Sequence, residues 1–226
     1  MNLGSGLGNY IRLLSRDDAV AYNTLIQDSF KKVSEFRAEP QTLCWTLTDD
    51  HYYVLGLFKN HQLVAFLRME WIESIPELRF KTDEDTILFQ PEFPIGYLAK
   101  AGTATAEKNK GLNSILRYHA LKIFLDLEIQ SVIGIIAEGS ARHKTMEEIG
   151  YQFTAKQKPW NGNFKSDRKI VIGHLSDRST IVQACERLEK KVGLHEICTF
   201  TLHSDVKQIV LQGRTDLVFP WSKMTA

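Results

Sequence analysis

One stretch of the sequence, residues 95–137, restricts the fold more than any other. Apolar side chains from Leu112 to Leu127, with His119 among them, recur at offsets of 3, 4, 7, 8, 11, 12 and 15 residues, the spacing of one face of an α-helix. A strand-forming segment, residues 95–103, precedes this helix, and a continuous apolar run, residues 130–137, follows it. A run that is apolar throughout indicates a strand covered on both faces. The stretch therefore predicts a βαβ unit with two parallel strands.

The loop before this helix, GTATAEKNKGLN, has the composition of an anion-binding turn. The N-terminus of a helix carries unpaired N–H groups and the positive end of the helix dipole, and both favour phosphate. Gly111 lets the backbone approach a ligand closely, and Asn109 and Asn113 tolerate unusual dihedral angles. Lys108 and Lys110 either add charge to a phosphate site or are solvated loop residues.

The segments around this unit alternate between strand and helix patterns. Residues 72–94 contain three prolines and an acidic cluster, Asp83–Asp85, and we expect a long polar connection that covers a substrate. The other predicted elements are a strand at 10–14, a helix after the caps Ser15 and Asp18, a hairpin of 51–58 and 63–71 turning at Asn60, a helix at 140–149 ended by Gly150, paired strands at 150–153 and 169–174, a helix at 177–192, and strands at 197–202 and 208–212.

The order of elements predicts one α/β (α+β) domain with a mixed sheet flanked by helices. We expect a flexible lead-in at 1–9, a core at 10–175 and a C-terminal α/β extension at 176–226 packed on that core. Phe219 and Trp221 suit either burial in the same chain or a homodimer contact.

Composition narrows the compartment and the partners. A net charge of +1 gives no electrostatic reason to expect nucleic acid. The sequence shows no signal peptide and no apolar run near the roughly 20 residues of a membrane span, so we expect a cytoplasmic protein. Cys44, Cys185 and Cys198 are odd in number and lack C-x-x-C spacing, which favours reduced, buried thiols.

Residues 108–116, KNKGLNSIL, resemble the acyl-CoA signature Q/R-x-x-G-x-G/A of the GNAT superfamily of N-acyltransferases. Lys108 falls on the Gln/Arg position, Gly111 on the first Gly and Asn113 on the second, so only the central Gly is kept. The hairpin LGLFKNHQLVAFLRM and the segment MEEIGY also look like family elements. The order of elements over residues 10–175 is similar to that of the GNAT fold.

The resemblance implies a GNAT-like mixed sheet, splayed at its centre, that binds acyl-CoA as co-substrate without a metal. The thioester carrier enters between the fourth and fifth strands, with pantetheine along the fourth strand and the pyrophosphate on the loop. Carried over, the cofactor-binding residues are Ala101, Gly102, Thr103, Ala104, Thr105, Lys108, Asn109, Lys110, Gly111, Leu112 and Asn113.

Acyl transfer to an amine needs a base, an oxyanion contact and a proton donor for the thiolate. Family members place a carboxylate on the fourth strand and a Tyr in the helix after the fifth. Here residues 96–101 contain no carboxylate, and Met146 occupies the Tyr position. A backbone N–H in residues 101–103 is the expected oxyanion contact.

The catalytic candidates are therefore substitutes. Glu70 in the third strand is a candidate base acting through a water, and Tyr97 and Tyr151 are candidate hydroxyl donors or simply core or rim aromatics. Glu138 either faces the site or caps a helix, and His143 is either an acid–base group or a surface histidine.

Three functions are consistent with these residues. The first is an N-acyltransferase that moves an acyl group from acyl-CoA to a primary amine of a small molecule or amino acid by direct attack. The second resembles the N-acyl amino acid and acyl-homoserine lactone synthase branch, with acyl carrier protein as donor and partner. That branch's E-x-S/T-R element would fall on Tyr97–Lys100, which keeps only the basic end. The third is a GNAT-like module that binds without turnover.

Overall fold

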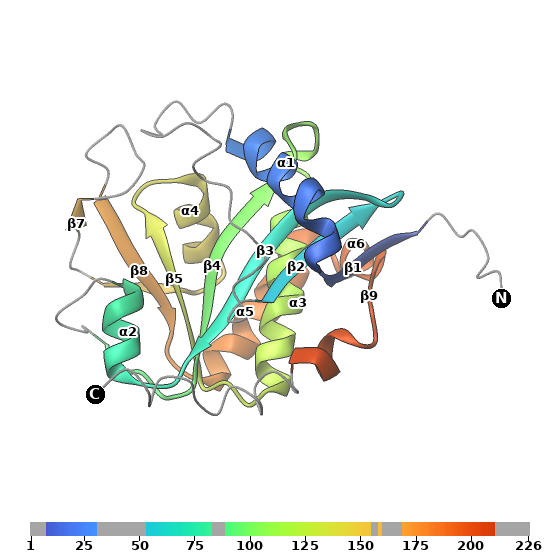
Figure 1. Ribbon diagram of the computed structural model, residues 1–226. Helices are drawn as coiled ribbons and strands as arrows, with labels where there is room; N and C mark the ends of the chain where they lie inside the picture. Colours follow the sequence, from blue (N-terminus) through green and yellow to red (C-terminus); the bar gives the residue numbers. More distant parts are fainter. Residues whose placement is uncertain (1–7, 31–52, 83–88, 155–157, 160–168, 211–226) are drawn as a thin grey trace, which may run out of the picture.

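A nine-stranded mixed sheet forms the centre of the molecule (Figure 1). Its strands run in the order β6-β8-β5-β4-β3-β2-β1-β9, with β7 paired to β8 off this path. The computed structural model describes residues 8–30, 53–82, 89–154, 158–159 and 169–210. The strands are β1 (Asn9–Leu13), β2 (Tyr53–Lys59), β3 (Gln62–Ile72), β4 (Ile95–Thr103), β5 (Ser131–Ala137), β6 (Gln152–Phe153), β7 (Lys158–Pro159), β8 (Lys169–Leu175) and β9 (Phe200–Leu202).

Helices cover both faces of this sheet. They are α1 (Ala19–Phe30), α2 (Ile75–Thr82), α3 (Leu112–Asp126), α4 (Ala141–Glu148), α5 (Arg178–Val192) and α6 (Leu194–Cys198), with 3-10 turns η1 (Arg16–Asp18) and η3 (Thr105–Glu107). None of the helices in the described ranges is long and apolar enough to cross a bilayer. The mixed α/β fold class predicted from the sequence is confirmed.

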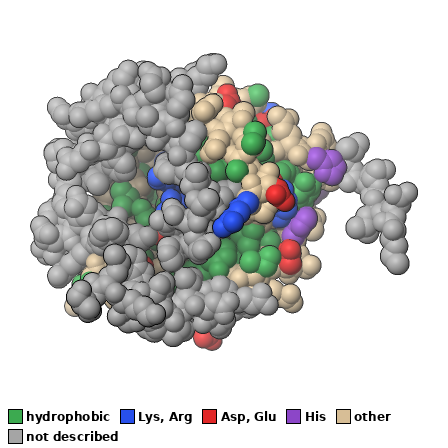
Figure 2. Space-filling model, viewed as in Figure 1, with side chains coloured by type: hydrophobic (Ala, Val, Ile, Leu, Met, Phe, Trp, Pro, Cys, Tyr) green, Lys and Arg blue, Asp and Glu red, His purple; other side chains and the backbone are tan. Residues whose placement is uncertain are grey.

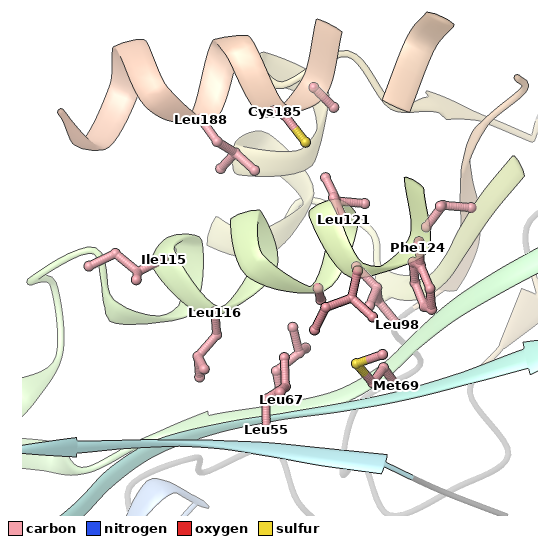
Figure 3. Close-up of a cluster of buried hydrophobic side chains, with 14 of the residues drawn as sticks. Leu55, Leu67, Met69, Leu98, Ile115, Leu116, Leu121, Phe124, Cys185 and Leu188 are labelled. Carbon is pink, nitrogen blue, oxygen red and sulfur yellow. The ribbon is translucent and has the colours of Figure 1, made fainter. Parts of the chain in front are cut away.

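The side chains of β3 point alternately to the two faces of the sheet, and their contacts show which helices cover each face. Leu67 and Met69 point toward α3 and join the largest core cluster. Figure 3 shows α3 lying between these strand side chains and Leu188 of α5. Phe66 points the other way and packs with α1, and Ile72 on the same side packs with α2. The sheet is therefore covered by α1 and α2 on one face and by α3 and α5 on the other.

The predicted βαβ unit is present, with α3 between the parallel strands β4 and β5. Gly111 is the N-cap of α3, and its φ of 73° lies in the left-handed region. The hairpin is also confirmed, and its turn is tighter than predicted. Asn60 and His61 both have positive φ, 48° and 64°, which is the type I′ turn that suits a twisted hairpin.

Ser15 and Asp18 form the predicted capping box before α1. The Ser15 N–H donates to Asp18 Oδ2 at 2.8 Å, and the Arg12 guanidinium donates two hydrogen bonds to the same carboxylate, at 2.6 and 2.7 Å. These hydrogen bonds lower the pKa of Asp18, and those from Arg12 have the largest effect. The local chemistry of the sequence is therefore sufficient to place the start of this helix.

Three expectations were wrong. The connection at 72–94 contains one helix that was not expected, α2; Pro76 stands in its first turn, where the missing N–H costs nothing. The strand expected at 197–202 is shorter, since α6 runs to Cys198. Residues 206–210 are helical, where a strand had been expected. Cys198 is an exposed thiol, although Cys185 is buried as expected.

Several expectations lie outside the described residues. They concern residues 1–7 of the lead-in expected at 1–9, Cys44, the acidic cluster Asp83–Asp85, and Phe219 and Trp221.

The C-terminal part of the described chain packs on α3 and also pairs with the β1 edge of the sheet. Helix α5 packs on α3, and Tyr118 donates a hydrogen bond to Glu189 at 2.7 Å. Strand β9 adds to the sheet edge in parallel with β1. Among the residues coloured in Figure 2, positive, negative and hydrophobic side chains are interspersed, in keeping with the small net charge of +1.

Candidate acyl-CoA site

Strands β4 and β5 separate at the centre of the sheet. They pair only from Ile95↔Ser131 to Tyr97↔Ile133. Beyond that row β4 stays paired to β3 as far as Thr103, and β5 stays paired to β8 as far as Ala137. Each strand therefore follows its outer neighbour, and the inner edges of β4 and β5 diverge toward their C-terminal ends.

A β-bulge in β4 lies at the start of this divergence. Leu67 opposes Ala101 and Met69 opposes Leu98, so β4 carries one more residue than β3 in this interval, within Ala99–Lys100. Bulges re-aim side chains and release backbone groups from a ladder. This one changes the direction of β4 where the two strands part.

The inner edge of β4 offers free amides at alternate residues. The Ala104 N–H donates to Val64 O on β3 at 2.8 Å. Because N–H groups alternate sides along a strand, those of Ala101 and Thr103 point away from β3, toward the divergence. The Thr105 N–H donates to Asp28 Oδ2 at 2.6 Å. Within residues 101–105, two amides are therefore left unpaired by the described strands and can bond a ligand.

The loop between η3 and α3 presents a run of unpaired amides. Asn109 and Gly111 both have left-handed φ, 66° and 73°, and turn the chain into the helix. No N–H of residues 108–113 donates to an acceptor within the described parts of the chain; the first N–H that does is that of Ser114, which bonds Gly111 O. A Cβ on Gly111 would meet nothing closer than 3.8 Å, so the loop is open there. These amides and the helix dipole form an anion cradle.

The loop lysines hold the cradle in place. Lys108 Nζ donates to Ser29 O of α1 at 3.0 Å. Glu107 receives Lys59 Nζ at 2.7 Å and Lys110 Nζ at 3.1 Å, and these hydrogen bonds lower its pKa. Both lysines, which the sequence left as either phosphate contacts or solvated loop residues, therefore have partners in the protein, Lys108 on α1 and Lys110 on Glu107. Within the described residues, the loop amides are the donors that remain for a ligand.

The predicted catalytic residues fall into two groups. Glu70 and Tyr97 face each other across β3 and β4, in the last row before the strands diverge. Glu138 and His143 lie past the end of β5, and the five residues from Ile133 to Glu138 correspond to roughly 16 Å of strand. The structure therefore does not bring the four residues together.

His143 and Met146 have structural contacts. His143 Nδ1 accepts from the Gly139 N–H at 3.2 Å, and its ring packs edge-on against Phe153. Met146 is fully buried, with its methyl group against Gly134 of β5. The position at which the family resemblance expects a Tyr is therefore filled by core packing.

Lys100 at the bulge joins the group around Glu70. Glu70 is 3% exposed and forms an ion pair with Arg68 Nη2 at 3.3 Å. Burial lowers the pKa of Lys100 to about 8; Arg68 adds to this shift and Glu70 opposes it. Sequence reasoning missed Lys100 because a lysine in a strand gives no sign of the bulge that buries it.

Solved structures share this architecture. The ribosomal-protein-S18-alanine N-acetyltransferase of Escherichia coli superposes with a TM-score of 0.52 at 14% identity, covering 74% of this chain and 92% of its own. A Desulfovibrio desulfuricans protein described as a GNAT-family acetyltransferase gives 0.53 at 11% identity, with 75% and 99% covered. The fold is that of the GNAT acetyltransferases. The PaiA N-acetyltransferase of Thermoplasma acidophilum, solved with coenzyme A, gives 0.51 at 13% identity, with 73% and 98% covered.

No family model matches this sequence, and no curated protein matches it. The GNAT fold is thus evident in the arrangement of strands and helices and not in overall sequence identity. No group of three His, Cys, Asp or Glu side chains within the described ranges is placed to hold a metal ion.

Proposed function

We propose that the protein transfers an acyl group from acyl-CoA to a primary amine of a small molecule or amino acid by direct attack. One observation carries the proposal: the amides of residues 108–113, unpaired within the described residues, follow β4 after the short turn η3, where β4 and β5 diverge. The combination supplies an anion cradle next to an unpaired strand edge. Such an arrangement suits a carrier that ends in a diphosphate and continues as an amide-bearing arm.

The residues present fit acyl-CoA. The amides of residues 109–113 would hold the diphosphate, and those of Ala101 and Thr103 would pair with the pantetheine arm. Asn113 Nδ2 donates to Thr103 Oγ1 at 2.7 Å, which ties the start of α3 to the end of β4. The two parts of the site are therefore held in one geometry before any ligand binds.

The reaction requires a group that accepts the proton of the attacking amine, and the candidates lie on the face of the sheet that carries Glu70. The amine nitrogen attacks the thioester carbonyl, a C–N bond forms, the C–S bond breaks, and the thiolate leaves with the electron pair. We assign the amine proton to Lys100 because Arg68 already holds Glu70, and because a pKa of about 8 lets Lys100 lose and regain a proton near neutral pH. We assign the oxyanion contact to the Ala101 N–H, which points away from β3.

The first test is binding followed by turnover. Calorimetry with acetyl-CoA and longer acyl-CoAs should show binding, and release of free thiol with a panel of primary amines should identify the acceptor. The rate should rise as the pH passes through about 8, and Lys100→Gln should remove that rise. If no acyl-CoA binds, acyl transfer from CoA is excluded.

Binding without turnover of any amine would instead indicate a non-catalytic module. Turnover only with acyl chains carried by acyl carrier protein would indicate the synthase-like alternative. The same assay therefore separates the three functions.

A further inference from the structure

Two arginines, one buried and one partly buried, extend between α3 and α4. Arg117 of α3 is 3% exposed. Arg142, in the first turn of α4, extends to β4 and donates to Leu98 O at 3.2 Å and to Ala99 O at 3.3 Å. Its guanidinium therefore lies where β4 leaves β5, at the base of the divergence.

No carboxylate among the described residues neutralises either guanidinium. Among the described residues, Arg117 Nη1 donates to Met146 Sδ, a weak acceptor, at 3.8 Å, and its guanidinium also acts on the buried hydroxyl of Tyr151, which carries no negative charge. Arg142 Nε is buried and has no hydrogen-bond partner within the described part of the chain. Burial and the neighbouring charge of Arg117 lower the pKa of Arg142 to about 10, so the two positive charges act on each other. Because an arginine stays protonated in a protein, this arrangement is costly without an anion.

The anion at this place is not the diphosphate of the carrier. Arg117 is five residues beyond Leu112, which corresponds to about 7.5 Å along α3 from the amide cradle. Arg142 instead reaches the carbonyls at the bulge, beside Ala101, where the proposed function places the thioester. Tyr151, buried with its hydroxyl unpartnered within the described chain, lies near both arginines.

We propose that Arg142 and Arg117 bind a carboxylate of one of the reactants at the base of the divergence. This inference rests on the proposed function and specifies its substrate class. The arginines come from α3 and α4 and the cradle from the start of α3, whereas Glu70 lies on the opposite face of the sheet. A terminal carboxylate on the acyl group, as in succinyl-CoA, therefore matches the position better than a carboxylate of the acceptor.

The test compares two acyl-CoAs of equal chain length. Succinyl-CoA ends in a carboxylate and butyryl-CoA ends in a methyl group. By calorimetry on the full chain, the wild type should bind succinyl-CoA at least about tenfold more tightly, and Arg142→Gln should bring the two dissociation constants together. Arg178→Gln is the matched control, because Arg178 also donates to a backbone carbonyl, Leu125 O at 3.1 Å, but is exposed on α5. It should keep the full preference.

A second arm identifies the source of the carboxylate. If the two acyl-CoAs bind the wild type equally, amino acids are titrated in the presence of CoA, and binding that depends on Arg142 assigns the carboxylate to the acceptor. If neither succinyl-CoA nor any amino acid responds to Arg142→Gln, the inference is wrong even though CoA binds. If neither acyl-CoA binds at all, the proposed function fails instead. Should Arg142→Gln not fold, the comparison of ligands on the wild type and on Arg142→Lys still decides.

Discussion

The anion cradle can be tested by one charge placed at Gly111. Gly111→Asp and Gly111→Asn have nearly the same shape, and both residues tolerate the left-handed φ of 73° found there. A Cβ at this position has no atom closer than 3.8 Å, so both side chains fit. The two variants therefore differ in a single negative charge beside the amides of residues 108–113.

The expected difference follows from Coulomb's law. For a diphosphate of about two negative charges roughly 6 Å from the new carboxylate, at an effective dielectric constant of about 40 to 80, the repulsion is about 1.4 to 2.8 kcal/mol. The dissociation constant for CoA should therefore be roughly 10- to 100-fold larger in Gly111→Asp than in Gly111→Asn. The measurement is calorimetry at about 0.01 M ionic strength, and the difference should shrink at about 0.15 M.

Two controls separate charge from damage. S-acetyl-pantetheine lacks the diphosphate, so both variants should bind it equally. Asp at a helix N-terminus is favourable, so Gly111→Asp should unfold no more easily than Gly111→Asn. Equal CoA affinities for the two variants would refute the reasoning, because the diphosphate would then lie elsewhere.

Three further predictions concern stability and are measured by urea denaturation. Gly96→Ala should destabilise the fold by about 1 to 3 kcal/mol, because its Cβ would stand 2.6 Å from the buried ring of Phe124; adding Phe124→Leu should recover part of this loss. Burial lowers the pKa of His119 from 6.5 to about 4, so the unfolded chain binds the proton first; stability should fall by about 2 kcal/mol between about pH 7 and about pH 5, and less in His119→Phe. Asp18→Asn should cost about 1 to 3 kcal/mol, because it breaks the charged hydrogen bonds with Arg12.

Each of these three stability predictions would be contradicted by one result. A double variant at 96 and 124 that is no more stable than Gly96→Ala would mean that the ring is not the obstacle. A wild type and a His119→Phe variant with the same pH dependence would show that this histidine is not buried as a neutral group. An Asp18→Asn protein as stable as the wild type would mean that the capping box is replaced by solvent.

The periodicity of apolar residues predicted the secondary structure correctly where a helix or strand buries one regular face. Helix α3 and the β2–β3 hairpin were predicted from spacing and turn chemistry, and the structure has both. Residues 206–210 were mispredicted because a short apolar run fits a strand or a helix equally well. Helix α2 was missed because three prolines and an acidic cluster in residues 72–94 favoured a polar connection, although proline is tolerated in a first turn.

The site was harder to predict than the fold because its chemistry depends on tertiary contacts. The cradle is visible in the sequence, since Gly111 and Asn109 have local conformational roles. Arg117 and Arg142 are not, because charged residues in helices are usually solvated and only packing against β4 and Met146 buries them. The proximity of Lys100 to Glu70 follows from a bulge, and an extra residue in one strand leaves no mark in the sequence pattern.

The pairing of β9 with β1 has a consequence for how the chain is made. Residues 9–11 cannot pair with residues 200–202 until the latter emerge from the ribosome, about 10 to 40 s later at roughly 5 to 20 residues per second. During that interval the outer edge of β1 is a bare template for any other extended chain. We therefore expect nascent chains stalled before residue 200 to aggregate or recruit chaperones more readily than finished ones, a difference that ribosome-bound truncations would reveal.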